Sequence, residues 1–251
     1  MLSTSHEDLK AQIVTQCREL FPEVKSIVFW GGSVVPGFSK AINDVDVILE
    51  IDSEFKQEVV LAERLKTLIQ TTSICRLDPF IYLTGSSESE PLELIAPFGF
   101  YKANAFIPYL IQKQHEIAYG KSRLLNRLAP VTLNEALVGF HPQVMGALKR
   151  LRMDAQVEPT WAPLLSKHKS YFFMITRTYF AFEHAGVGTK QESLSYLAQK
   201  FPRYQNLVEH LDAALEGKQA PGDEPGSELI LDFVRDMEGV MLGAIRQATT
   251  H

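Results

Sequence analysis

The sequence has few cysteines and lacks any long apolar run. Only two cysteines occur among 251 residues, Cys17 and Cys75, and they show neither the paired spacing of a zinc site nor the density of a disulfide scaffold. No stretch approaches the roughly 18 consecutive apolar residues of a transmembrane helix. The amino-terminal residues carry charges where a signal peptide needs an apolar core. We therefore expect a cytoplasmic protein that makes no membrane contact.

The sequence also lacks an excess of positively charged residues. The 25 lysines and arginines are outnumbered by 30 aspartates and glutamates, for a formal net charge of −5. Proteins that bind nucleic acid through bulk charge carry the opposite sign, so this balance argues against such a partner and leaves only tRNA open. The hydrophobic fraction of 45% and the charged fraction of 22% are ordinary for a globular protein with a substantial core.

Apolar periodicity predicts strands early in the chain and helices later. We expect a helix from residues 5–8 to about residue 21, strands over 25–30, 45–51 and 74–83, and a helix over 55–70. Pro79 argues that the third strand is an edge strand or contains a bulge. Further helices are expected over 106–114, 133–153 (as one helix or two), 167–184, 191–200, 204–215 and 227–247. The pattern predicts an α+β fold, with a mixed sheet and flanking helices over residues 1–128 and a helical bundle over residues 129–251.

One pattern near the start carries chemistry. Gly31-Gly32-Ser33 follows the first predicted strand, and Asp44-Val45-Asp46 comes ten residues later, inside the second. Alternation along a strand places Asp44 and Asp46 on one face, where two close carboxylates repel each other unless a cation lies between them. Mg²⁺ commonly binds one or two carboxylates together with phosphate oxygens. Glycines let the backbone approach a ligand, and Ser33 adds a hydroxyl where helix amides meet an anion.

This combination resembles the signature of the DNA polymerase beta-type nucleotidyltransferase superfamily. The resemblance implies that Asp44 and Asp46 are catalytic metal ligands, that Gly32 and Ser33 contact the phosphates, and that Mg²⁺ and ATP are the cofactors. It also implies a third carboxylate on a neighbouring strand.

Two acids are candidates for that third carboxylate. Asp78 is the only acid inside the third predicted strand, and Glu93 is the alternative. The expected roles of the third acid are metal ligand and general base.

Later segments resemble one branch of the superfamily, the streptomycin/spectinomycin (aminoglycoside) adenylyltransferases. His115–Gly120, Thr176–Tyr179 and Gly188–Gln191 occur in the same order as in those antibiotic-resistance enzymes. The resemblance implies transfer of AMP from ATP to a hydroxyl of a small molecule, an aminoglycoside-type antibiotic, bound between the two domains. It also implies that Lys190 and Arg177 contact the nucleotide and that Trp161 lies near the acceptor.

Other functions stay open at this point. The segment after Trp161 becomes basic at Lys167-His168-Lys169, which favours a nucleotidyltransferase that modifies protein or tRNA, as toxin/antitoxin-like members do. A non-catalytic nucleotide-binding module is a further alternative. Arg177 and His184 loosely match the pattern of HEPN ribonucleases. The sequence decides neither the acceptor, nor the nucleotide preference, nor the oligomeric state.

Overall fold

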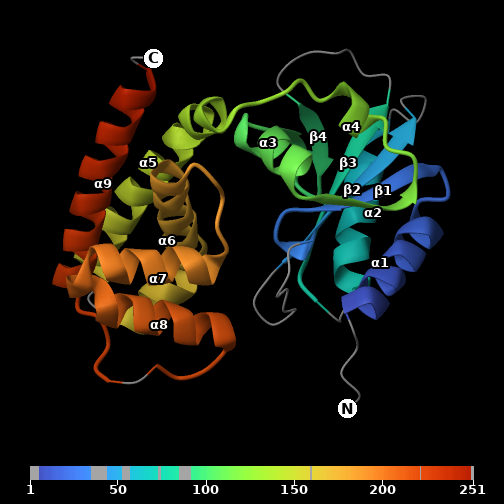
Figure 1. Cartoon of the computed structure of the whole chain (residues 1–251). Coiled ribbons are helices and arrows are strands. Elements are labelled where there is room, and N and C mark those ends of the chain that lie inside the picture. The colour runs from blue at the N-terminus through green and yellow to red at the C-terminus, as the bar shows by residue number, and fades with distance from the viewer. Residues whose placement is uncertain are drawn as a thin grey trace. The chain divides into compact units, whose positions relative to one another are not determined.

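A computed structural model of the chain describes residues 6–34, 44–52, 57–72, 75–84, 92–158, 160–220 and 222–249 (Figure 1). Residues 5, 55, 56 and 74, with which two predicted helices and one predicted strand begin, lie outside these ranges. The chain divides into two compact units, residues 1–132 and 133–251.

The first unit contains a six-stranded mixed sheet with the strand order β5-β4-β3-β2-β1-β6. Strands β2 and β3 are parallel and the other neighbours are antiparallel, so helix α2 makes the crossover that a parallel pair requires. The described elements are α1 (His6–Leu20), β1 (Val24–Trp30), the 3₁₀ turn η1 (Gly31–Val34), β2 (Val45–Asp52), α2 (Glu58–Thr71), β3 (Leu77–Thr84), β4 (Glu93–Ala96), β5 (Gly99–Lys102), α3 (Phe106–Lys113), β6 (His115–Gly120) and α4 (Leu124–Arg127).

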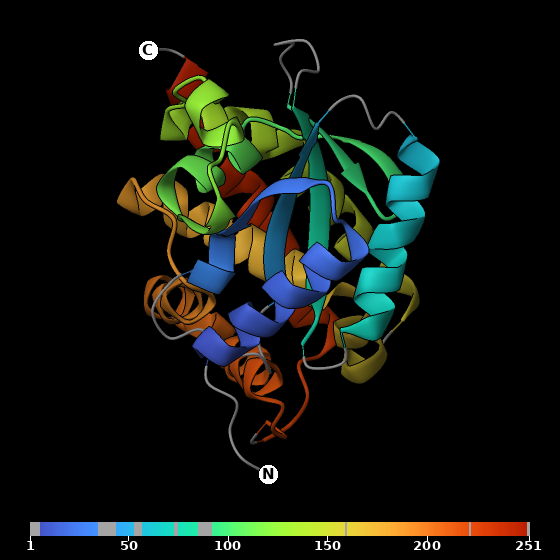
Figure 2. The same cartoon turned by 90° about the vertical axis from the view of Figure 1, so that its right-hand side faces the viewer.

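One face of this sheet packs against α1 and α2. Figure 2 shows both helices on the same side of the strands. Alternate strand residues on this face, among them Phe29, Val47 and Ile81, are fully buried against Ile13 of α1 and Leu65 of α2. Because side chains alternate along a strand, the residues between them point to the opposite face. The helix-covered face therefore supplies the core, and the opposite face is the one that carries the aspartates.

Pro79 predicted an edge strand or a bulge. The edge position is wrong, because β3 lies between β2 and β4, and no bulge interrupts the register of β3 with β2. Pro79 pairs with Val47 on the β2 side. On the β4 side, the pairing within the described residues is at Ile81↔Ile95. Pro79 precedes that pair near the start of β3, where a strand tolerates a missing backbone N–H more readily than at its centre.

The second unit is helical, as predicted. Residues 133–157 form one helix with Pro142 inside it, which settles the choice between one helix and two. Aromatic side chains fill the centre: Phe172 and Tyr204 both contact the ring of Phe233, with centroids 5.8 Å and 5.6 Å away. The elements are α5 (Leu133–Val157), α6 (Trp161–His184), α7 (Lys190–Lys200), the 3₁₀ turn η2 (Pro202–Tyr204), α8 (Gln205–Glu216) and α9 (Ser227–Thr249). Within the described ranges, no helix combines the length and apolar character needed to cross a bilayer.

Candidate functional site

The register of the sheet brings two of the predicted aspartates side by side. Asp46 on β2 and Asp78 on β3 are direct partners across the parallel pair, and Trp30 on β1 is the partner of Asp46 on the other side. Paired residues on neighbouring strands point to the same face, which here is the face opposite α1 and α2. Asp44 lies two residues before Asp46, immediately ahead of β2. The structure therefore groups the three acids that the sequence singled out.

The electrostatics of Asp78 reflect this grouping. Burial raises the pKa of the Asp78 carboxyl above its usual value, and the negative charge of Asp44 raises it further, while the charge of Arg76 acts in the opposite direction. The Arg76 guanidinium lies 3.5 Å from an Asp44 carboxylate oxygen (Nε to Oδ1) at an exposed position. A carboxylate with a raised pKa is a better proton acceptor than an ordinary aspartate.

Gly31 connects the glycine-containing turn to these acids. Its backbone has φ = +64°, and a Cβ at this position would lie 2.9 Å from Oδ2 of Asp46. Its N–H donates to the carbonyl oxygen of Gln114 at 3.0 Å, which holds the turn against the start of β6. Only glycine combines this left-handed conformation with so close an approach to the carboxylate. Gly31 is thus a site residue that the resemblance, which rests on Gly32 and Ser33, did not single out.

Ser33 shapes the turn from inside. The side chain is fully buried, and its hydroxyl donates to the carbonyl oxygen of Trp30 at 2.8 Å. Its donor is therefore committed to closing η1, which starts at Gly31 and includes Gly32. Backbone amides at the start of a helical turn have no acceptor within the turn. Binding of phosphate by Gly32 and Ser33 stays a prediction, and the groups that would bind are their backbone N–H groups.

Glu93, the alternative third carboxylate, lies elsewhere on the sheet. In the antiparallel register set by Ile81↔Ile95, Glu93 falls opposite Leu83, which is five residues beyond Asp78 along β3. That separation corresponds to about 16 Å along the strand. Glu93 also shares the side of Ile95, whose side chain belongs to the helix-covered core. The register thus favours Asp78.

The donor set suits a hard cation such as Mg²⁺. Asp44, Asp46 and Asp78 offer carboxylate oxygens, the ligand type that this ion prefers, and the close approach at Gly31 leaves Asp46 facing the turn. The described residues contain no group of three or more potential ligands already within metal-binding reach of one another. The three acids fit Mg²⁺ in ligand type and in the face of the sheet that they share.

Two buried polar atoms flank the turn. Within the described part of the chain, the indole Nε1 of Trp30 and the side-chain Oε1 of Gln114 have no hydrogen-bond partner. Trp30 is 5% exposed, and its ring contacts that of Phe80, with centroids 6.3 Å apart. An unsatisfied buried donor costs about 1–3 kcal/mol, and in native proteins such groups concentrate where something else binds or moves.

In the second unit, the two predicted nucleotide-binding cations occupy one locality. Arg177 donates from Nε to the carbonyl oxygen of Gly188 at 3.1 Å, and Gly188 lies two residues before Lys190. Lys190 begins α7, and its ammonium lies 5.5 Å from the ring centre of Phe173. The helix start is held by a capping box in which Thr189 is the N-cap residue. Arg177 thus orders the loop from which Lys190 extends.

Trp161 lies in the core of the second unit. Its side chain is 3% exposed and contacts the rings of Phe172 and His210, with centroids 5.6 Å and 6.0 Å away. No observation here tests its predicted contact with the acceptor, which stays a prediction.

The basic segment after Trp161 has partners within the second unit. Lys167 and His168 both reach Oδ2 of Asp154, at 2.7 Å and 2.5 Å. These two contacts lower the pKa of the Asp154 carboxyl to about 2. Lys169 donates to the carbonyl oxygen of Ala214 at 2.7 Å. Each of the three residues has a partner within the unit, but the Lys167 side chain is still 55% exposed, so the single Asp154 carboxylate offsets only part of the basic character of the segment.

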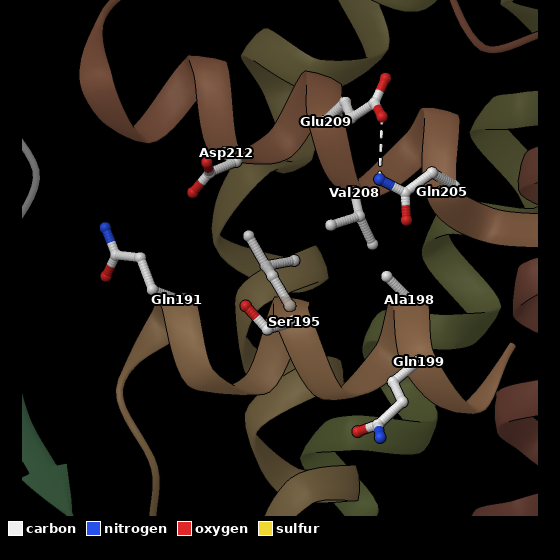
Figure 3. Close-up of a pocket in the computed structure, with 9 residues that line it drawn as sticks. Gln191, Ser195, Ala198, Gln199, Gln205, Val208, Glu209 and Asp212 are labelled. Atoms are coloured by element: carbon white, nitrogen blue, oxygen red, sulfur yellow. Dashed lines mark hydrogen bonds between the residues drawn. The ribbon is translucent and has the colours of Figure 1, made fainter. Parts of the chain in front are cut away.

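A groove of about 490 Å³ lies between α7 and α8 (Figure 3). Figure 3 shows Glu209 and Asp212 along α8 and Gln191 and Ser195 along α7. Its lining combines amides, a hydroxyl and two carboxylates with a few apolar side chains, and it includes no lysine or arginine. The lining residues are Gln191, Leu194, Ser195, Ala198, Gln199, Gln205, Val208, Glu209 and Asp212.

Comparison with solved structures identifies a close match in fold. A crystal structure of the spectinomycin adenyltransferase AAD(9) from Enterococcus faecialis, with ATP and spectinomycin, superposes with a TM-score of 0.64. The alignment covers 94% of this chain and 99% of that one. The two proteins share a fold. Their sequences are only 10% identical, so the likeness establishes the architecture and not the activity.

Comparisons by sequence add nothing to this. No family model matches the chain, and no curated protein matches it. The expected α+β architecture is confirmed: a mixed sheet with flanking helices, followed by a helical unit.

Proposed function

We propose that this protein is a Mg²⁺-dependent nucleotidyltransferase that transfers AMP from ATP to a hydroxyl group of a small molecule. The observation that carries the proposal is the alignment of Asp46 with Asp78 across the parallel strand pair, next to a turn so close that a Cβ at Gly31 would lie 2.9 Å from Oδ2 of Asp46. The shared fold with an adenyltransferase solved with ATP and spectinomycin supports the same reaction class. The non-catalytic alternative gives no physical reason for keeping two acids so close together.

In this proposal Asp44 and Asp46 hold the cation, and Asp78 completes the set. A bound Mg²⁺ would polarise the α-phosphate and offset the negative charge that develops during transfer. Asp78 accepts the proton of the acceptor hydroxyl on a carboxylate oxygen, a role that its raised pKa favours. The hydroxyl oxygen forms a bond to the α-phosphorus, and the bond between that phosphorus and the pyrophosphate oxygen breaks. The backbone of Gly32 and Ser33 lies against the phosphates.

The second unit supplies positive charge in the same proposal. Lys190 neutralises phosphate charge of the nucleotide, and Arg177 keeps the Gly188 loop in the conformation from which Lys190 extends. Lys190 begins α7 at a backbone position that the capping box holds, so its flexible side chain can leave the Phe173 ring and meet a phosphate while α7 stays rigid.

We propose a hydroxylated small molecule as the acceptor, with an aminoglycoside-type antibiotic as the first candidate. The pairing of Lys167 and His168 with Asp154 supports this choice, because the carboxylate offsets part of the positive charge that favoured tRNA or an acidic protein. A cationic antibiotic would therefore meet less net positive charge at this segment than the sequence alone indicates. Protein or tRNA as the acceptor remains the second candidate.

Label transfer from ATP carrying ³²P at the α-phosphate tests the proposal. The protein is incubated with Mg²⁺ and, separately, with spectinomycin, streptomycin, other hydroxylated antibiotics, bulk tRNA or cellular protein. We expect one acceptor to become labelled in Mg²⁺ and none in EDTA. Cleavage of RNA in EDTA would instead support the ribonuclease alternative based on Arg177 and His184.

Two variants on β2 test whether the reaction takes place at Asp46. Asp46→Asn should lower turnover at least about 100-fold, because it removes a charge that offsets the developing phosphate charge. Asp52→Asn is the matched control: the same substitution on the same strand, where Asp52 accepts a hydrogen bond from Thr84 at 2.7 Å. It lies six residues from Asp46, or about 20 Å along the strand. Near-normal turnover in Asp46→Asn would remove Asp46 from the mechanism.

A further inference from the structure

The η1 turn of the candidate site is supported from behind by helix α1. The side chain of Phe29, two residues before Gly31, points to the helix-covered face of the sheet. The ammonium of Lys10 lies 5.9 Å from the centre of its ring. His6, one helical turn before Lys10 on the same side of α1, forms a hydrogen bond with the backbone of Ser33. Helix α1 therefore contacts both the strand that leads into the turn and the turn itself.

An ion pair fixes this part of α1 to strand β6. Lys10 is 6% exposed, and its ammonium donates to a carboxylate oxygen of Glu116. Glu116 lies on β6 and is the register partner of Phe29. The residue just before β6 is Gln114, which accepts the N–H of Gly31. Lysine is rarely so buried unless it is paired, because its charge loses its solvation by water. The pair thus ties α1 to the segment that holds the start of the turn.

The His6 ring has a single hydrogen-bond donor at neutral pH. Burial lowers the pKa of the imidazole below its usual value of 6.5, and the positive charge of Lys10 lowers it further. The bond to Ser33 and the negative charges of Glu7 and Glu116 act in the opposite direction. A ring with a lowered pKa is neutral at pH 7 and carries one N–H group. Because Nε2 is buried without a hydrogen-bond partner in the described part of the chain, we assign the bond with Ser33 to Nδ1.

We propose that His6 is a positioning residue of the candidate site, which holds the Ser33 backbone in the conformation that binds phosphate. The ion pair of Lys10 with Glu116 keeps His6 next to the turn. The Ser33 hydroxyl cannot take over this task, because it already donates to the carbonyl oxygen of Trp30. This role rests on the proposed function, in which backbone N–H groups of the turn bind the phosphates. A turn that is held before the ligand arrives loses less conformational entropy on binding, and His6 contributes through Ser33 without touching the substrate.

Binding of ATP in Mg²⁺, measured by equilibrium titration, tests the role of His6. His6→Ala removes the bond to Ser33, and we expect the Kd to rise about tenfold, the upper range for one hydrogen bond. His6→Asn retains an amide N–H close to the position of Nδ1, so its Kd should stay within about twofold of wild type. An unchanged Kd in His6→Ala, or the same loss of affinity in both variants, would overturn the inference.

Gln16→Ala is the matched control on the same helix. Gln16 accepts a hydrogen bond from the Thr72 hydroxyl at 2.9 Å, and it lies ten residues from His6, or about 15 Å along α1. Its replacement should lower the free energy of unfolding in urea as His6→Ala does, while the Kd for ATP stays unchanged. An equal rise in Kd in both variants would show that His6 acts through stability alone and would overturn the positioning role.

Amide hydrogen exchange tests the turn without any ligand. The N–H of Gly31 donates to the carbonyl oxygen of Gln114 at 3.0 Å, and its exchange rate, followed by NMR, rises when the turn loosens. His6→Ala should speed this exchange about tenfold, and Lys10→Met, which removes the ammonium, should also speed it. His6→Asn and Gln16→Ala should leave the rate unchanged. An unchanged rate in His6→Ala or Lys10→Met, or an equal increase in Gln16→Ala, would overturn the inference. Failure of wild-type protein to bind ATP would overturn the proposed function, and the exchange rates would still decide whether His6 holds the turn.

Discussion

Replacement of Gly31 by alanine should destabilise the first unit and disturb the candidate site. The destabilisation has two sources. The first is backbone strain, because φ is +64° at this position. A residue with a Cβ loses roughly 1–2 kcal/mol in this left-handed conformation. The second is contact, because the new Cβ would lie 2.9 Å from Oδ2 of Asp46.

The contact should act mainly on the carboxylate. The Asp46 side chain can rotate away from the new methyl group, at about 0.5–1.5 kcal/mol if it leaves a preferred rotamer. We therefore expect Gly31→Ala to lower the free energy of unfolding of the first unit by about 1.5–3.5 kcal/mol in all, the sum of the two parts. The displaced carboxylate should weaken Mg²⁺-dependent nucleotide binding about 10- to 100-fold, as when a metal ligand loses its support.

Gly217 provides a control with the same strain and no contact. It ends α8 with φ = +66°, and a Cβ there would meet nothing within 4 Å. Gly217→Ala should therefore lower the free energy of unfolding by the backbone strain alone and leave nucleotide binding intact. The chain has two tryptophans, Trp30 in the first unit and Trp161 in the second, so urea unfolding can be followed for each unit by fluorescence in a single-tryptophan background.

Suppose that Gly31→Ala and Gly217→Ala lower the free energy of unfolding equally, and that both variants bind nucleotide in Mg²⁺ as tightly as wild type. The Asp46 carboxylate would then not take part in nucleotide binding next to the η1 turn. The sheet face opposite α1 and α2 could then no longer be assigned as the reaction centre.

Three further predictions follow from single side chains. Asp78→Asn should lower kcat by about 10²–10⁴ while nucleotide binding persists, measured by turnover and by equilibrium binding, because a general base acts in the chemical step. Lys190→Ala should weaken ATP binding about tenfold, and Lys200→Ala at the other end of α7 should not, as titration with ATP can show. Asp154 has a folded pKa of about 2 against an ordinary value of 3.8, so its contribution to stability is complete above the higher value and disappears as the pH falls through the lower. The stability difference between wild type and Asp154→Asn should therefore be full at pH 6 and shrink in urea titrations between pH 4 and pH 2.

Local patterns were sufficient for most elements of the fold. The strands at residues 24–30 and 45–52 were predicted to within a residue at each end, because long runs of apolar and β-branched residues have few alternatives. The four-residue strands β4 and β5 were not predicted as strands, since so short a run shows no clear period. The edge position predicted from Pro79 was wrong because edge or centre is decided by which strands pair, a long-range property.

The candidate site was also predicted partly from local sequence and partly only from the pairing of strands. Strand periodicity alone placed Asp44 and Asp46 on one face, and the residue types alone indicated a hard cation. The sequence favoured Asp78, the only acid inside the third predicted strand, and left Glu93 as the alternative. The register of the sheet supports the same choice, because it places the position opposite Glu93 about 16 Å from Asp78 along the strand.

Some features exist only in three dimensions. No local signal connects Glu50 with Ser122, 72 positions later, or Lys167 and His168 with Asp154 on the preceding helix. Sequence determines which groups a chain can offer, since composition and periodicity are local. Whether a charge meets a partner, a metal or water depends on segments far apart in the chain, and that is decided when they pack.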